Sequence, residues 1–259
     1  MDVGVCLFGS GPEMESARED VEFAGSCEAN ILIGGERGVG KRLIGRHIHR
    51  NSRWNHLPLA FVRCARPQPA VQSDLLTAFD QDPGTIVLYD VDELTPDSQR
   101  LLSELLGRHG AGRSRGEWET RRHVRVIACA SAHLYDSVRA AAFREELFYR
   151  LNTVRVSIPP LRDRREDIPG LILRLLGRQE EQGVSSSRRV TRPAMARLVA
   201  HGWPGNVREL EQVLREISRD RSVIRSEDLP QHVPSYGLDA ERRAQTASAD
   251  VPMAIAREN

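Results

Sequence analysis

The stretch Ile31–Arg42, which reads ILIGGERGVGKR, has the residue types and the spacing of a phosphate-binding loop. Three apolar residues come first in this stretch. Four residues then separate Gly35 from Gly40, and Lys41 follows, which gives the pattern G-x-x-x-x-G-K. Glycines let backbone N–H groups turn toward phosphate oxygens, and a helix that begins here directs its positive end at the same anion. Ser or Thr usually follows the lysine to hold magnesium, but this chain has Arg42. A glycine-rich turn without a ligand is the alternative interpretation.

The basic composition gives a second reason to assign chemistry to this loop. Lysine and arginine together number 37, and Lys41 is the only lysine among them. A compact ammonium group meets a phosphate as a point charge, whereas a guanidinium is a planar fork. The sequence therefore predicts that one loop binds phosphates, with contacts from Gly35, Glu36, Arg37, Gly38, Val39, Gly40, Lys41, Arg42 and Leu43.

Apolar runs predict the strands and helices that position the loop. We expect strands at Ile31–Ile33, Phe61–Cys64, Thr85–Tyr89, Val124–Cys129 and Val154–Ile158. Helices are expected between them, at Glu13–Ala24, Leu43–Arg50, Ser73–Phe79 and Pro96–Leu106. Strands that alternate with helices favour an α/β fold with a parallel sheet covered on both faces, whose ligands lie at the carboxyl ends of the strands.

The C-terminal third of the chain has a different character. Short helices are expected at Ile168–Gln179, Arg192–His201 and Asn206–Arg219. We predict an α/β domain over 1–165, a small helical domain over 166–232 and a poorly ordered tail over 233–259. A flexible connection is expected over 180–189, and the arginine-rich segment 107–122 is either a solvated loop or an anion contact.

Composition limits the class of protein. A formal charge of +1 argues against a general polyanion binder, and four widely spaced cysteines suggest a reduced compartment. The N-terminus lacks the pattern of a signal peptide, and no apolar run approaches the roughly 18 residues of a membrane span. We therefore expect a cytoplasmic protein that does not contact a membrane.

Several motifs together resemble the AAA+ domain of bacterial sigma-54-dependent transcription activators, over about residues 8–230. The loop GGERGVGK at 34–41 is similar to that family's GESGTGKE, in which the residue after the lysine is also not Ser or Thr. FREELFYRLN at 143–152 resembles FREDLYYRLN, and IPPLRDRREDIP at 158–169 matches almost letter for letter. WPGNVRELE at 203–211 resembles the family's lid motif.

The resemblance implies a P-loop AAA+ fold with a helical lid, and a ring of subunits, alike or related, that bind ATP with Mg²⁺ at their interfaces. Arg144 and Arg150 match the positions from which this family reaches into the neighbouring site. A guanidinium aimed at the γ-phosphate stabilises the charge of the transition state. Arg208 matches the lid arginine that senses phosphates within its own subunit. Surface ion pairing is the alternative role for these arginines.

The acidic motif departs from the family pattern G-T-x-x-x-D-E, in which Asp serves the magnesium and Glu polarises the attacking water. Without a gap, Tyr89 replaces the Asp and Asp90 replaces the Glu. A shift by one residue gives Asp90 for the metal but Val91 for the base. Asp92 and Glu93 form an intact acidic pair two residues later. The candidates are therefore Asp90 for the metal, and Asp90 and Glu93 for catalysis.

Other departures concern hydrolysis and partners. Ser131 stands where the family has an asparagine after the next strand. Phosphate affinity depends mainly on the loop and Lys41, whereas hydrolysis needs a positioned water, so we expect ATP binding with slow hydrolysis. The GAFTGA loop that contacts sigma-54 is expected to be absent, because Cys64 leads through 73–79 directly to Gly84. Neither a receiver-like domain nor a helix-turn-helix DNA reader is evident.

Three functions remain open from the sequence. The first is a transcription regulator that hydrolyses ATP and acts on the transcription machinery through unusual contacts. The second is a hydrolysis-poor regulatory subunit that joins or opposes rings of a complete activator. The third is a scaffold that has lost nucleotide binding.

Overall fold

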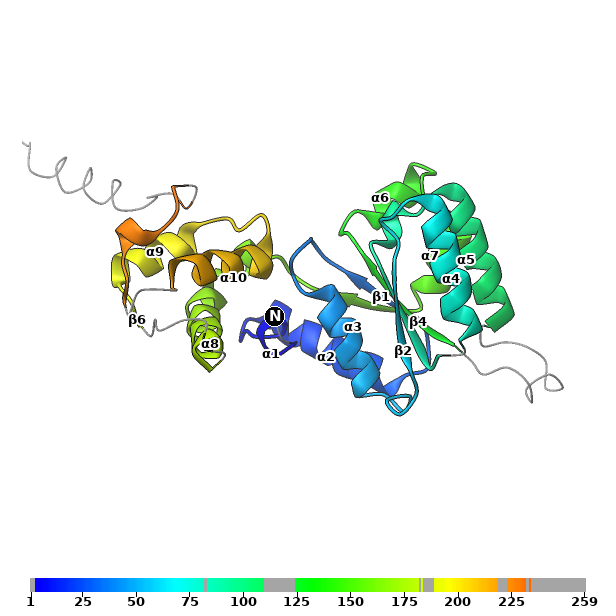
Figure 1. Cartoon of the computed structure of the whole chain (residues 1–259), viewed down its shortest axis with the longest axis horizontal. Coiled ribbons are helices and arrows are strands. Elements are labelled where there is room, and N and C mark those ends of the chain that lie inside the picture. Colours follow the sequence, from blue (N-terminus) through cyan, green and yellow to red (C-terminus); the bar gives the residue numbers. More distant parts are fainter. Residues whose placement is uncertain are drawn as a thin grey trace, which may run out of the picture. The chain divides into compact units, whose positions relative to one another are not determined.

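The computed structural model describes residues 3–81, 83–109, 124–181, 183, 189–218, 223–231 and 233. It divides into two compact units (Figure 1). The first unit is Met1–Asp167 with Pro204–Glu209, and the second is Ile168–Trp203 with Leu210–Asn259. Pro204–Glu209, the middle of the predicted lid motif, thus groups with the first unit, whereas Trp203 and the end of the motif belong to the second. The predicted domain boundaries at 165 and 232 remain predictions. Most of 107–122 and 180–189, and nearly all of 233–259, lie outside the described residues.

The first unit is built on a sheet of five parallel strands in the order β2-β3-β4-β1-β5. The strands are β1 Ile31–Gly34, β2 Leu59–Arg63, β3 Thr85–Tyr89, β4 Arg125–Ala130 and β5 Val154–Ser157. Buried apolar residues fill β1, β3 and β4, the middle strands, as expected for strands covered on both faces. The predicted parallel α/β fold is confirmed. The phosphate-loop strand β1 lies between β4 and β5, so its loop leaves the sheet where the chain connections change direction.

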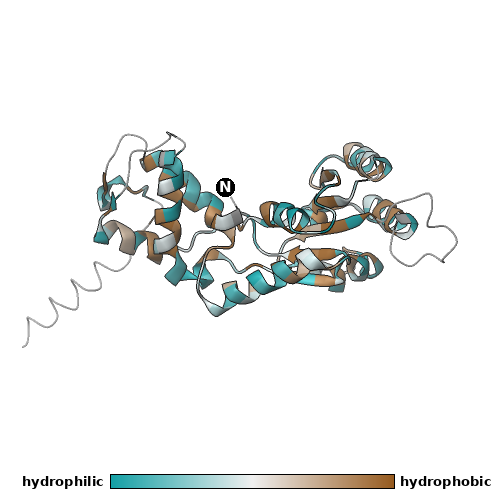
Figure 2. Ribbon diagram, turned by 90° about the horizontal axis from the view of Figure 1, so that it is seen from below, coloured by the Kyte–Doolittle hydropathy of each residue, from teal (hydrophilic) through white to brown (hydrophobic). Residues whose placement is uncertain are grey.

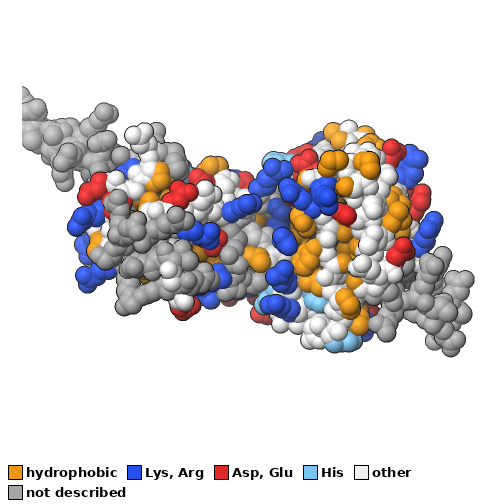
Figure 3. All heavy atoms as spheres, viewed as in Figure 1, with side chains coloured by type: hydrophobic (Ala, Val, Ile, Leu, Met, Phe, Trp, Pro, Cys, Tyr) orange, Lys and Arg blue, Asp and Glu red, His pale blue; other side chains and the backbone are white. Residues whose placement is uncertain are grey.

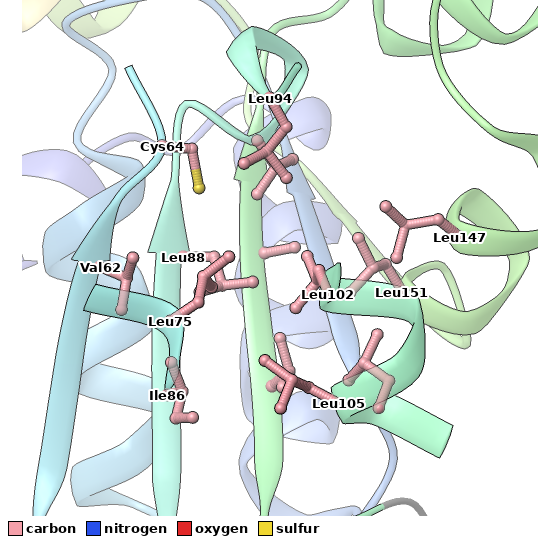
Figure 4. Close-up of a cluster of buried hydrophobic side chains, with 14 of the residues drawn as sticks. Val62, Cys64, Leu75, Ile86, Leu88, Leu94, Leu102, Leu105, Leu147 and Leu151 are labelled. Atoms are coloured by element: carbon pink, nitrogen blue, oxygen red, sulfur yellow. The ribbon is translucent and has the colours of Figure 1, made fainter. Parts of the chain in front are cut away.

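Helices cover both faces of this sheet, which makes a three-layer αβα unit (Figure 1). One face packs against α1 Val3–Cys6, α2 Pro12–Ser26 and α3 Lys41–Arg50. The other face packs against α4 Gln68–Asp80, α5 Pro96–His109, α6 Leu134–Arg139 and α7 Glu145–Leu151. Their brown apolar sides and teal polar sides are visible in Figure 2. Figure 4 shows Leu75 of α4 beside Leu88 of β3, with Leu102 and Leu105 of α5 and Leu147 and Leu151 of α7 on the same face of the sheet.

Helices α4 and α5 differ most from the predicted ranges, and both are longer. Helix α4 begins at Gln68 rather than Ser73, because Pro67 caps it and Pro69 suits its first turn. Helix α5 continues through Gly107 to His109, so the predicted arginine-rich loop starts later than expected. The sequence also missed α1, α6 and α7, all too short to give a clear helical repeat, and the single-turn helices Val91–Glu93, Leu161–Asp163 and Arg165–Asp167.

The second unit is mainly helical, as predicted. It contains α8 Ile168–Glu181, α9 Arg192–Ala200 and most of α10 Asn206–Ile217. A two-stranded parallel pair, β6 Arg189–Val190 and β7 Val223–Ile224, and the single-turn helix Ser226–Asp228 were not predicted. The Trp203 indole is fully buried in this unit and donates a hydrogen bond to the Leu198 carbonyl at 2.8 Å. None of the helices in the described part of the chain is long and apolar enough to cross a membrane.

Candidate functional site

The loop between β1 and α3 has the backbone conformation that its glycines make possible. Gly38 has φ +87° and Gly40 has φ +101°, both in the left-handed region that L side chains rarely adopt. A Cβ on Gly38 would also lie only 2.0 Å from the Gly205 carbonyl oxygen. Gly40 caps α3, so Lys41 is the first residue of that helix and the loop lies at its positive end. The predicted strand, loop and helix therefore meet in the arrangement that binds anions.

Lys41 is directed at the loop that precedes it. Its Nζ donates hydrogen bonds to the carbonyl oxygens of Gly35 at 2.6 Å and Glu36 at 2.9 Å. Burial lowers the pKa of the Lys41 ammonium, while Cys129, Asp92 and Asp90 oppose this shift. The amine is thus a single positive charge fixed beside the loop backbone.

A hollow of about 470 Å³ lies over this loop. Most of the predicted ligand-binding residues line it, together with Arg63, Tyr89 and Cys129, which the sequence did not suggest: the full set is Glu36, Arg37, Gly38, Gly40, Lys41, Arg42, Leu43, Arg63, Tyr89, Asp90, Cys129 and Arg208. Two predicted contacts lie elsewhere. Val39 is fully buried in the core under the loop, and Gly35 lines a separate cavity of about 120 Å³.

Asn206 holds the loop from the far end of the sequence. It is fully buried at φ +54°, a left-handed conformation that Asn tolerates better than most residues. Its amide donates to Glu36 Oε2 at 3.1 Å and to the Arg37 carbonyl at 3.0 Å, and it accepts from the Leu161 N–H at 2.8 Å. The neighbouring Arg208 N–H donates to the Gly38 carbonyl at 3.2 Å, which brings Arg208 to the hollow. The sequence named Arg208 but missed Asn206.

Glu36 is a second tether of the loop. Its carboxylate accepts two hydrogen bonds from the Arg162 guanidinium, at 2.7 and 2.8 Å. Mainly these bonds, with help from Asn206 and against partial burial, lower the Glu36 pKa from its ordinary 4.5 to about 2. Arg162 belongs to the predicted IPPLRDRREDIP motif, but only the structure shows what it contacts.

This shift predicts a pH-dependent contribution to stability. Because the Glu36 pKa falls on folding, the stabilisation is present above pH 4.5 and disappears as the pH falls toward 2. The pair is partly exposed to solvent, so we expect less than about 1 kcal/mol. Thermal unfolding of the wild type and of Glu36→Gln between pH 6 and pH 2 measures this. The gap between the two midpoints should narrow below pH 4.5, and a gap that stays constant over this range would contradict the assignment.

The end of β3 places Tyr89 and Asp90 at the hollow. Tyr89 is the last residue of the strand, and its ring lies 5.3 Å from the Arg42 guanidinium carbon. Asp90 follows at φ +60°, with its Oδ2 at 3.9 Å from Arg63 Nε. Glu93 instead forms an exposed ion pair with Arg37 at 3.0 Å and does not line the hollow. Of the predicted catalytic acids, only Asp90 reaches the site.

Arg144 directly precedes α7 and Arg150 lies on it, and neither lines this hollow of their own chain. Arg150 pairs with Glu146 at 2.8 Å and donates to the Ser103 carbonyl at 3.3 Å. Arg144 is exposed, and its backbone N–H donates to Gln99 Oε1 at 2.9 Å. The buried Gln99 also donates to the carbonyls of Leu94 and Ala142, so this side chain, which the sequence did not suggest, fixes the start of α7.

Comparisons with known proteins agree with this geometry. Residues 8–161 match the family model described as the sigma-54 interaction domain, and residues 162–246 match the AAA+ ATPase lid domain. The chain is 32% identical to the nitrogen fixation protein AnfA of Azotobacter vinelandii over 95% of its length, and 35% identical to the Nif-specific regulatory protein of the same organism over 86%. It covers 51% and 45% of those two proteins, so it spans about half the length of the curated relatives it matches.

A solved structure of NtrX from Brucella abortus in complex with ATP is also similar. It superimposes with a TM-score of 0.74 at 26% identity, over 93% of this chain and 60% of NtrX.

Proposed function

Because the chain belongs to the family of sigma-54 interaction domains with an AAA+ lid, which confirms the predicted resemblance, we propose that it binds ATP at Lys41 and regulates transcription. The observation that carries the proposal is the loop itself. Glycine-permitted backbone turns, a helix N-terminus and a fixed ammonium group converge on one hollow. The ATP complex of the related NtrX supports the choice of nucleotide.

The residues of the hollow have separate parts in binding. The loop N–H groups and Lys41 would hold the β- and γ-phosphates, as in other P-loop proteins. Arg208 lines the same hollow of its own chain and would contact the phosphates of a bound nucleotide. Asn206 and Arg162 hold the loop in shape from outside the hollow.

Hydrolysis is expected to be slow. An attacking water needs a carboxylate that accepts its proton. Glu36 and Asp90 both line the hollow, but the Glu36 carboxylate is taken up by the Arg162 guanidinium, which leaves Asp90 as the candidate acid. Its carboxylate faces Arg63, which competes with water for it. The Ser131 N–H donates to Asp92 at 3.3 Å, so this second acid is also engaged. Asp90 is a poor magnesium ligand here, because its carboxylate is paired with Arg63 and lies among several guanidinium groups.

A second candidate function is a regulatory subunit that works beside a complete activator. It is favoured by the position of Arg144, which is exposed at the start of α7 and does not line its own hollow. Such a subunit would lend Arg144 and Arg150 to a neighbour's nucleotide. The unbroken helix α4, which joins β2 and β3 through short connections, supports the prediction that no GAFTGA loop is present to contact sigma-54.

The single lysine provides a direct test of the ATP site. An amine-reactive ester can modify only Lys41 and the α-amino group of this chain, and mass spectrometry separates the two products. ATP at ten times its Kd should slow the modification of Lys41 about tenfold, because only the unbound fraction reacts. The α-amino group is the internal control and should react at an unchanged rate. Equal rates of Lys41 modification with and without ATP would contradict ATP binding at Lys41 and favour the third function, a scaffold that has lost nucleotide binding.

Turnover measured on the same preparation separates the two candidate functions. We expect ATP hydrolysis well below about 1 s⁻¹, against a typical enzyme rate of about 10 s⁻¹. Solution mass should rise with ATP if the chain forms rings with itself. If it instead co-elutes with a related complete activator and turnover stays at the level of buffer, the regulatory-subunit function is supported.

A further inference from the structure

The hollow at the phosphate loop carries an unusual excess of positive charge. Five basic side chains line it, namely Arg37, Lys41, Arg42, Arg63 and Arg208, against two acidic ones, Glu36 and Asp90. Glu36 is already neutralised by the two hydrogen bonds from Arg162. Figure 3 shows basic side chains, in blue, gathered along one edge of the first unit. Even with Arg37 paired to Glu93 and Arg63 facing Asp90, the site therefore provides more positive charge than the loop lysine alone.

Arg42 is fixed at the position where P-loop proteins commonly present a hydroxyl to magnesium. Its guanidinium carbon lies 5.0 Å from the centre of the Phe61 ring and 5.3 Å from that of Tyr89. Aromatic rings at these distances attract a cation and hold it in place. The positive group thus packs over rings carried by β2 and β3 at the edge of the hollow, and does not extend freely into solvent.

The residues present do not fit a magnesium ion. Mg²⁺ takes six oxygen ligands in a near-octahedral arrangement and is usually held through one or two carboxylates and the substrate phosphates. Tyr89 replaces the carboxylate at the end of β3 and turns its ring to Arg42. Asp90 lies 3.9 Å from Arg63. Among the described residues, no group of three His, Cys, Asp or Glu side chains is placed to hold a metal ion.

Resting on the proposed function, we infer that this site binds the nucleotide triphosphate without Mg²⁺, with the guanidinium groups of Arg42 and Arg63 in place of the metal. A guanidinium group donates two parallel hydrogen bonds to phosphate oxygens and keeps its charge at every physiological pH. Two such groups in the same hollow as Lys41 would add to its neutralisation of the β- and γ-phosphates. A dication between them would meet like charge instead of ligands.

Calorimetric titration of the full chain with ATP tests this, once in EDTA and once in excess Mg²⁺. The Kd in EDTA should be equal to or lower than the Kd in Mg²⁺, because the metal competes with the arginines for the phosphates. A Kd in EDTA more than about threefold higher, which is roughly 0.6 kcal/mol, would overturn the inference and leave the proposed function standing. Absence of binding in both conditions would overturn the proposed function, and the inference with it.

Two variants locate the effect. Arg42→Ala and Arg63→Ala should each raise the Kd for ATP in EDTA roughly tenfold, the usual order for one charge-assisted hydrogen-bonding group. Arg46→Ala is the matched control, since Arg46 lies on the same helix and stacks on the same Phe61 ring at 5.2 Å but does not line the hollow. Its Kd should equal that of the wild type. Wild-type affinity in both Arg42→Ala and Arg63→Ala, or an equal loss in Arg46→Ala, would overturn the assignment.

Discussion

Lys41→Ala is expected to raise the Kd for ATP by about 100-fold, or about 2.7 kcal/mol. Lys41 Nζ is held at the loop by two carbonyl groups, so it meets the phosphates without losing much side-chain freedom on binding. Removal of the amine takes away a charge-assisted hydrogen bond in a partly buried site, where such bonds are worth most. Calorimetry or a fluorescent ATP analogue measures the change.

Lys41→Arg distinguishes the shape of the cation from its charge. The planar guanidinium cannot reproduce the position of an ammonium group between the Gly35 and Glu36 carbonyls, so we expect a loss of at least about tenfold despite the retained charge. Arg50→Ala, at the other end of α3, should leave the Kd unchanged, because Arg50 does not line the hollow. If Lys41→Ala binds ATP as tightly as the wild type, the proposed site is wrong.

Gly38→Ala should give the largest loss of stability, with a free energy of unfolding lower by about 3 kcal/mol or more. Two costs add at this residue. Its φ of +87° is strained for alanine, and the new Cβ would lie 2.0 Å from the Gly205 carbonyl oxygen, a backbone atom that cannot rotate away. The loop must therefore separate from the segment that carries Asn206 and Arg208. Affinity for ATP should fall together with stability.

Gly177→Ala is the matched control for this substitution. Gly177 lies inside α8, and an added Cβ would meet no atom within 4 Å. Alanine is a better helix former than glycine by up to about 1 kcal/mol, so this variant should be as stable as the wild type or slightly more stable. Urea unfolding followed by circular dichroism, together with ATP titration, compares the two. An unchanged unfolding midpoint in Gly38→Ala would show that the loop does not pack as described.

The resemblance to activators predicted roles for Arg144 and Arg150. The contacts that position these two residues come from residues far away in the sequence. Gln99 holds the start of α7 through the Arg144 N–H, across 45 residues of sequence. Arg164, in the motif after β5, is buried and donates to the carbonyls of Cys6 and Phe8. The charged motif at 158–169 thus serves in part to hold the N-terminal segment against the rest of the first unit. Motif matching alone does not reveal this structural role.

The sequence by itself determined the phosphate loop, the parallel sheet and the helical second unit. These depend on local properties, namely glycine spacing, apolar runs and helical repeats, which lie within a few residues of one another. The tertiary structure decided which side chains meet at the hollow. Glu36 pairs with Arg162 across 126 residues and with Asn206 across 170, and Tyr89 turns to Arg42 rather than to a metal. Such pairs form only when the sheet brings distant strand ends to one edge, because no short-range pattern records which remote partner each side chain will contact.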